Sequence, residues 1–222
     1  MVPNTSFKTK RLVSLAMLCA IAFVVTYLSR QIPIRVAGFL RMDFKDVVII
    51  IGGFIFGPIS AAAVSVVTSL IEMLTFSETG FYGFFMNVVS SCAFACIAAA
   101  FYKKSRTMKA SVVGLITGAL AMTIVMMLWN YIITPVYMGV DRERVAGMLI
   151  PTFLPFNLIK AGLNAALTIL MYKPVIVGLR KAGLVPASAS GKKGGINWGL
   201  MCAAVFLLAS LAVLLLVLAK II

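Results

Sequence analysis

The sequence contains no histidine, and only six of its 222 residues are aspartate or glutamate. Histidine and clustered carboxylates carry most general acid–base catalysis, so their scarcity argues against an enzyme. A structural zinc site needs about four cysteine or histidine ligands. The four cysteines are spread from Cys19 to Cys202, and we therefore expect neither a metal site nor a bound cofactor.

A nucleotide-hydrolysing motif is missing as well. A P-loop reads GxxxxGK[ST], whereas the stretch SGKKGG at residues 190–195 lacks the first glycine and the final serine or threonine. Charged residues make up only 12% of the chain, yet the net charge is +14. The basic residues cluster in short stretches between apolar runs, as orientation signals in membrane proteins do. We therefore expect neither ATP hydrolysis by this chain nor a nucleic-acid partner.

The apolar content is correspondingly high. Hydrophobic residues make up 62% of the chain and the mean hydropathy is +1.09. Several apolar runs approach the ~20 residues that cross a bilayer. The sequence predicts an all-α, multi-pass protein of the cell membrane, with apolar runs over 12–28, 47–74, 81–102, 111–133, 155–172 and 196–218. We expect the first run to be a retained span and not a signal peptide, because Arg30 and Gln31 follow it in place of a cleavage site.

The run 47–74 contains Gly57-Pro58, a pair at which a helix easily ends. If this run forms two spans and the N-terminus is inside, twelve lysines and arginines lie in inside segments and seven in outside segments. A single span would move the basic clusters at 103–109 and 173–193 outside, against the positive-inside rule. We therefore predict seven spans, with the N-terminus in and the C-terminus out.

Three segments follow from this division: a six-span core over residues 1–181, a cytoplasmic linker over 182–195 and an additional transmembrane helix over 196–222. The linker has the Pro/Ser/Gly composition of a flexible connection. The helix beyond it is mostly leucine, alanine and valine, so we expect it to pack rather than to form part of a site. Within the core, Gly114 and Gly118 form a GxxxG pattern that predicts close helix packing.

Polar residues interrupt the sixth span. If that helix begins near Pro155, then Asn157, Lys160, Asn164 and Thr168 follow at steps of three and four, which places them on one face. A lysine at a span centre costs roughly 2.5–3.5 kcal/mol to insert, and such residues usually face a cavity or a partner. We predict that this face lines a ligand pocket. The alternative, that Lys160 extends to the membrane surface, leaves Asn157 and Asn164 unexplained.

Two other stretches contribute to the predicted pocket. The stretch LWNYIITPVYMG places Asn130 between Trp129 and Tyr131. The rings alone would fit an interfacial aromatic belt, but the amide would not. The loop 33–44, which includes Phe39 and Met42, is placed to close over the outer end. Amides, one ammonium group and aromatic rings suit a flat heteroaromatic ligand with hydrogen-bonding edges, and a carboxylate ligand would also suit the lysine.

Three stretches resemble the riboflavin-binding S components of energy-coupling factor (ECF) transporters: MDFKDVVIIIGGFIFGPISA, LWNYIITPVYMG and LPFNLIKAG. The resemblance covers about residues 10 to 175, in the same order and spacing. It implies a six-helix vitamin-binding subunit whose pocket opens outward. It also implies partnership with a transmembrane coupling protein and two cytoplasmic ATPases, which supply the energy for uptake.

The resemblance further assigns roles to single residues. It implies that Asn130, Asn157 and Lys160 contact the flavin ring system and that the first outer loop caps the site. Small residues of the first span dock on the coupling protein in this family, and Ala16 and Ala20 supply the matching AxxxA pair. We therefore expect high-affinity capture of riboflavin from the outer face as the substrate-binding subunit of an ATP-driven transporter.

The chain departs from the family pattern in its seventh span and in the charge of its capping region. Arg30, Arg35 and Arg41 are a large positive charge for a neutral vitamin, which keeps another vitamin or flavin, such as folate or FMN, open as an alternative. A stand-alone secondary carrier is a further alternative, which the scarcity of buried acid pairs disfavours. Glu72 is the only acid within an apolar run, and we expect it near the lipid headgroups.

Overall fold

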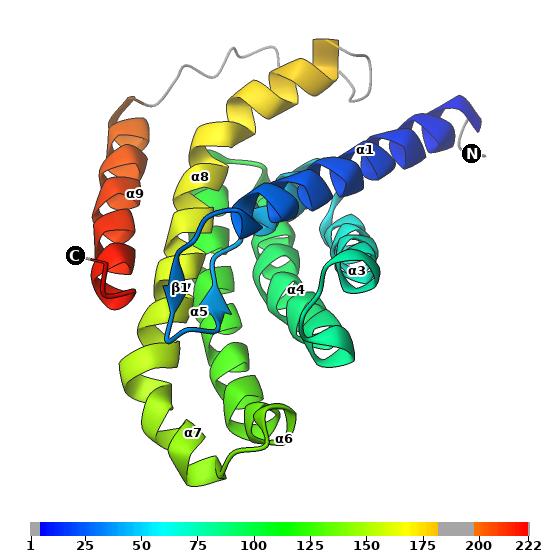
Figure 1. The fold of residues 1–222 in the computed structure, drawn as a ribbon. Helices are drawn as coiled ribbons and strands as arrows, with labels where there is room; N and C mark the ends of the chain where they lie inside the picture. The colour runs from blue at the N-terminus through cyan, green and yellow to red at the C-terminus, as the bar shows by residue number, and fades with distance from the viewer. Residues whose placement is uncertain (1–4, 182–197, 222) are drawn as a thin grey trace.

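Helices make up most of the computed structural model, which describes residues 5–181 and 198–221 (Figure 1). The long helices are α1 (Thr5–Arg30), α3 (Pro58–Thr75), α4 (Gly80–Ser105), α5 (Met108–Ile132), α8 (Leu154–Lys181) and α9 (Trp198–Leu218). The shorter elements are α2 (Lys45–Phe56), α6 (Thr134–Met138), α7 (Arg142–Met148), the π-helical turn η1 (Leu149–Phe153) and the strands β1 (Arg35–Val36) and β2 (Leu40–Arg41).

The predicted break between α2 and α3 is confirmed. Gly57 has φ +94°, a conformation that side-chain-bearing residues rarely adopt, and Pro58 begins the next helix at a position that needs no N–H donor. Six of the described helical segments have the length and hydropathy of a membrane span. At ~1.5 Å per residue, the 12 residues of α2 are too short to cross a ~30 Å hydrocarbon core alone. The helix predicted as the second span is therefore a short arm of a helical hairpin.

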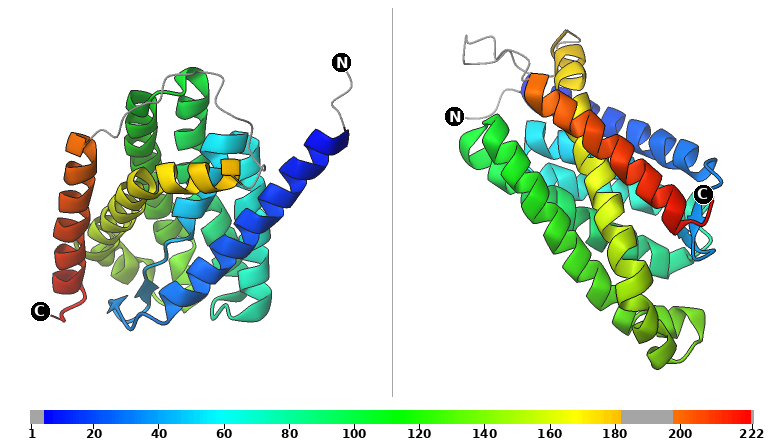
Figure 2. Two further views of the ribbon diagram at one scale, coloured as in Figure 1. Left: turned by 90° about the horizontal axis from the view of Figure 1, so that it is seen from above. Right: turned by 90° about the vertical axis from the view of Figure 1, so that its left-hand side faces the viewer.

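The elements at the two ends of the bundle agree with the predicted order of loops. At one end, which we call the turn end, Arg11 donates to Ser60 Oγ at 2.8 Å, and a Cβ placed on Gly57 would lie 3.9 Å from Lys103 Cδ. The other end, which we call the hairpin end, carries β1, β2 and the C-terminal end of α9 (Figures 1 and 2). The side of the membrane that each end faces stays a prediction.

The turn-end half of the core is packed through small residues. A Cβ on Gly114 would lie 2.8 Å from the carbonyl oxygen of Ala98, and one on Gly118 would lie 2.6 Å from that of Phe94. The predicted close packing at the GxxxG pattern is thus confirmed, between α5 and α4. Ala95 and Ala99 lie fully buried in the same cluster. These residues let the backbones approach closely, which is how membrane helices gain contact in the absence of a hydrophobic force between them.

The predicted capping loop contains a tight antiparallel hairpin. Val36 pairs with Leu40, and Ala37 and Gly38 turn the chain with positive φ angles. We call residues 34–44 the capping hairpin.

The predicted additional helix is present as α9, which packs against α8 on the side of the bundle away from α1 in Figure 1 and in the left view of Figure 2. The helix α8 is longer than the predicted span 155–172 and continues through Pro174 to Lys181. The predicted linker 182–195 lies outside the described residues.

Candidate functional site

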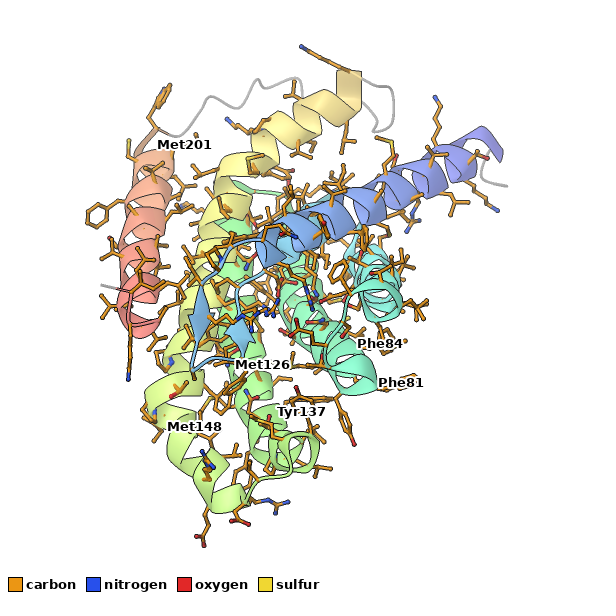
Figure 3. All side chains as sticks on the ribbon, in the orientation of Figure 1. Phe81, Phe84, Met126, Tyr137, Met148 and Met201 are labelled. Atoms are coloured by element: carbon orange, nitrogen blue, oxygen red, sulfur yellow. The ribbon has the colours of Figure 1, made fainter. Side chains whose placement is uncertain are left out.

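A cavity of about 160 Å³ lies beneath the capping hairpin at the hairpin end. Its wall is assembled from α1, the capping hairpin, α3, α4, α5, α6 and α8. Met126 of α5 and Tyr137 of α6, both labelled in Figure 3, belong to this wall, whereas Phe81 at the start of α4 is 70% exposed and points away from the bundle. Segments distant in sequence therefore meet at one site.

Six of the eight predicted binding residues line this cavity: Phe39, Met42, Trp129, Asn130, Asn157 and Lys160. The other two lie elsewhere. Tyr131 is on the outer side of α5, where the Arg142 guanidinium lies 5.5 Å from its ring, because adjacent helical residues point about 100° apart. Asn164 is fully buried one turn beyond Lys160 and is not part of the cavity wall.

The predicted polar face of α8 is buried along its whole length, from Asn157 to Thr168. The helix does begin near Pro155, at Leu154, but it follows the π-helical turn η1 directly. Prolines at 151 and 155 remove N–H donors there. Asn157 Nδ2 donates to the carbonyl oxygen of Phe153 at 2.8 Å, which holds its amide at the cavity wall. A π-helical turn of this kind is often found at functional sites.

Lys160 forms an ion pair with Asp43, the residue that follows Met42 in the capping hairpin. Lys160 Nζ lies 2.7 Å from Asp43 Oδ2, and both side chains are largely buried. Asn164 Nδ2 donates to the backbone oxygen of Asp43 at 3.1 Å and to that of Lys160 at 2.9 Å. Asn164 thus positions the ion pair instead of facing the cavity. The pair fastens the hairpin to α8 across 117 residues of sequence.

The Asp43 carboxylate keeps unused hydrogen-bonding capacity. Burial raises the pKa of this carboxyl, but the ammonium groups of Lys160 and Lys45 outweigh the effect, so its pKa lies below the ordinary value. Within the described residues, Asp43 Oδ1 is buried without a hydrogen-bond partner. A buried acceptor without a donor costs about 1–3 kcal/mol. A ligand that supplies an N–H or O–H group would relieve that cost.

A second buried ionic cluster adjoins the first. Glu72, which we expected near the headgroups, is 5% exposed and accepts from Lys45 at 2.7 Å, Asn87 at 3.1 Å and Arg30 at 3.4 Å. The expectation was wrong because α2 folds back along α3 and places Lys45, 1% exposed, against it. Asp46 is buried beside Lys45 and accepts from Ser91. Buried acids are therefore present in pairs with lysines and arginines, and their predicted scarcity does not disfavour a secondary carrier.

Sequence reasoning missed Asp43 and Lys45, although a signal was available. A lysine buried in a membrane span needs a carboxylate partner, and the chain has only six acids from which to choose. Two of them, Asp43 and Asp46, lie in the stretch MDFKD, where the chain passes from the capping hairpin into α2. Because a buried Lys160 needs a counter-ion, the sequence offers these two aspartates as its candidate partners.

The charges around the cavity balance. Arg30 pairs with Glu72, Arg41 with Glu78 at 2.7 Å, and Lys160 with Asp43, and all six residues line the wall. Of the three arginines that suggested a large positive charge, Arg30 and Arg41 are therefore paired with carboxylates at the site, whereas Arg35 is exposed on β1 and is not part of the cavity wall. Within the described ranges, no group of three or more histidine, cysteine, aspartate or glutamate side chains is placed to hold a metal ion.

The AxxxA pair lies away from the cavity. Ala16 and Ala20 are exposed on α1, on the same outward face as Met17 and Val24. A helix face of small and apolar residues in a membrane protein is available to lipid or to another helix.

The chain is similar in sequence and in structure to known membrane proteins. The family model of the ECF transporter substrate-specific component matches residues 10–172. The riboflavin transporter RibU of Staphylococcus aureus (strain TCH60) is 34% identical over 172 residues, which are 75% of this chain and 90% of that protein. The riboflavin transporter FmnP of Bacillus subtilis (strain 168) is 32% identical over 162 residues, 69% of this chain and 85% of that protein. The solved S component of a bacterial ECF transporter superposes with a TM-score of 0.66 at 34% identity, covering 78% of this chain and 99% of that one.

Proposed function

The chain belongs to the substrate-specific components of ECF transporters, and from this premise we propose that it captures riboflavin at the outer face of the cell membrane for uptake. It is a multi-pass membrane protein and a transporter component rather than an enzyme. The riboflavin transporters that it resembles supply the ligand class, and the cavity beneath the capping hairpin supplies the site.

The Lys160–Asp43 pair, set among amides in a mainly apolar cavity, is the observation that carries the proposal. A flavin ring presents carbonyl and ring-nitrogen acceptors and one N–H donor along its polar edge. The amides of Asn130 and Asn157 and the remaining N–H groups of Lys160 can donate to the acceptors. Asp43 Oδ1, buried and without a partner among the described residues, can accept from the N–H group. A site built to hydrogen-bond its ligand rejects rings that lack the matching atoms.

The charge balance of the cavity favours riboflavin over an anionic ligand. Arg30, Arg41 and Lys160 each have a carboxylate partner, so a phosphate or carboxylate would have to compete with a protein group for its cation. Moving a charged group from water without a partner is costly. The cavity therefore supports a neutral vitamin better than FMN or a folate.

The energy for uptake comes from partners. The chain lacks a P-loop, and ECF substrate-specific components work with a separate energising module. We assign that module here to one transmembrane coupling protein and two cytoplasmic ATPases. The outward face of α1 around Ala16 and Ala20 is the proposed docking surface, and its exposure supports this role.

The proposal is tested by mixing purified protein with riboflavin and separating unbound flavin by gel filtration. We expect the protein peak to carry the flavin absorption bands, with flavin fluorescence quenched because Trp129 lines the cavity. Protein that elutes without flavin at micromolar concentrations would contradict the assignment of riboflavin.

A further inference from the structure

The helix α9 has a regular inward face. Ala204, Leu208, Leu211, Leu215 and Leu218 follow one another at steps of four and three, the spacing of a helix that packs along a single neighbour. Ala204 and Leu215 are buried, whereas the adjacent Leu214 is 49% exposed. The helix therefore has one face that packs against the bundle and another that is exposed, although both faces are apolar.

A notch in α8 receives this face. A Cβ placed on Gly162 would lie 2.5 Å from Leu211 Cδ1, so only glycine leaves room for the leucine at its present depth. Interlocking of this kind is the main source of stability between membrane helices, because lipid tails are as apolar as leucine. This contact lies within the α8–α9 interface, where Leu211 packs over Gly162.

Beyond the notch, α9 reaches the capping hairpin. Leu215 belongs to one apolar cluster with Val36 and Met42 of the hairpin and with Phe156, Ile159 and Leu163 of α8. Leu218 and Ala219 pack against the same cluster. The three ribbon views agree in placing the C-terminal end of α9 beside the hairpin (Figures 1 and 2). Met42 also lines the cavity, so the cluster joins α9 to the site.

We propose that α9 is a buttress of the capping hairpin and so sets how long a ligand is retained beneath it. The cluster that includes Leu215 holds the apolar side of the hairpin, while the Lys160–Asp43 pair holds the segment that follows its second strand. A ligand covered by the hairpin leaves when the hairpin opens. The structural half of the proposal concerns the hairpin alone, and the half that concerns retention rests on riboflavin being the ligand.

The family model ends at residue 172, before α9 begins. A buttress outside the matched region would let this chain adjust ligand retention without changing any residue of the cavity wall. That separation makes the role testable with substitutions in α9 that change no residue of the cavity wall or of the hairpin itself.

The test compares Leu215→Ala with Leu214→Ala, the same change on the inward and outward faces of one helix. Hydrogen exchange of the amides in residues 34–44 is measured on ligand-free protein in detergent. We expect exchange about tenfold faster in Leu215→Ala, equivalent to ~1.4 kcal/mol of lost packing, and no change in Leu214→Ala. Leu218→Ala, at the edge of the cluster, should give a smaller increase. Equal exchange in Leu215→Ala and Leu214→Ala would overturn the buttress.

Riboflavin release is then followed by the recovery of flavin fluorescence after dilution. We expect release to be several-fold faster from Leu215→Ala than from wild type or Leu214→Ala. Faster hairpin exchange with unchanged release would overturn the role in retention. If no variant and no wild-type protein binds riboflavin, the proposed ligand is wrong, while the exchange comparison still decides whether α9 supports the hairpin.

Discussion

The two ends of the bundle are built from different chemistry. At the hairpin end, α1, the capping hairpin, α3, the loop that follows α3 and α8 bring six charged side chains together around a cavity. In the half toward the turn end, α4 and α5 approach through glycine and alanine. Charge inside a membrane protein is expensive and marks function, whereas small residues mark close packing. The contrast separates the residues that should govern binding from those that should govern stability alone.

The largest effect is expected from Lys45→Met at the hairpin end. The substitution leaves Glu72 buried and deprived of its shortest ion pair, 2.7 Å in the native chain. Removing one partner of a buried pair typically costs about 3–5 kcal/mol. We expect the thermal unfolding temperature of Lys45→Met, measured in detergent, to be lower than that of the wild type. If Lys45→Met unfolds at the wild-type temperature, the buried cluster is not a structural element.

A somewhat smaller effect, on affinity, is expected from Lys160→Met. The substitution keeps length and apolarity but removes the donor, and hydrogen bonds to charged groups are worth about 1.5–3 kcal/mol, or about 10- to 150-fold in affinity. Fluorescence titration with riboflavin measures it. The control is Thr168→Val on the same buried face, whose hydroxyl donates only to the Asn164 carbonyl among the interactions described and should matter little. Equal affinities for both variants would reduce Lys160 to a structural residue.

In the other half of the bundle, Gly118→Ala should reduce stability without reducing affinity. The added Cβ would lie 2.6 Å from the backbone oxygen of Phe94, so α4 and α5 must move apart, at about 1–3 kcal/mol for an overpacked site. Gly178→Ala in α8 is the matched control, since among the described residues no atom outside the adjacent stretch of α8 lies within 4 Å of its Cβ position. If Gly118→Ala lowers riboflavin affinity as much as Lys160→Met does, the α4–α5 contact affects binding as well as stability, which would contradict the proposed separation.

The smallest effect on stability is expected from Arg41→Gln at the rim of the cavity. Its partner Glu78 is 64% exposed, and exposed ion pairs contribute about 0.2–1 kcal/mol. The change in unfolding temperature should be near the limit of detection and should shrink further at high salt. A large loss of stability would show that the rim pair belongs with the buried clusters.

The sequence predicted the elements better than the contacts between them. Hydropathy located the long helices, and the backbone chemistry of Gly57-Pro58 placed the turn between α2 and α3. The spacing of Asn157, Lys160, Asn164 and Thr168 predicted one polar face lining a pocket. The four residues do share a buried face, but only Asn157 and Lys160 line the cavity. These are local properties, since each depends on helix periodicity or on one dihedral angle.

The pairing of charges could not be read locally. Lys45 precedes the apolar run 47–74 and is one of the seven charges predicted outside, yet it is buried against Glu72. Asp43 pairs with Lys160 across 117 residues of sequence. Partner choice depends on how α2 and the capping hairpin fold back onto the bundle, which no hydropathy pattern records. Tyr131 shows the same limit, because a residue adjacent to Asn130 in sequence faces away from the cavity.

The cavity wall pairs each of its three cations with a carboxylate, and we propose that it therefore selects a neutral flavin. The most direct test is a pair of fluorescence titrations of wild-type protein, one with riboflavin and one with FMN. We expect riboflavin to bind at least about tenfold more tightly, a difference of ~1.4 kcal/mol, because the FMN phosphate finds no unpaired cation among the described residues of the wall. The difference in affinity between riboflavin and FMN should be smaller in Glu78→Gln, because this substitution removes the carboxylate partner of Arg41. If FMN binds to the wild-type protein as tightly as riboflavin does, the cavity does not select a neutral flavin.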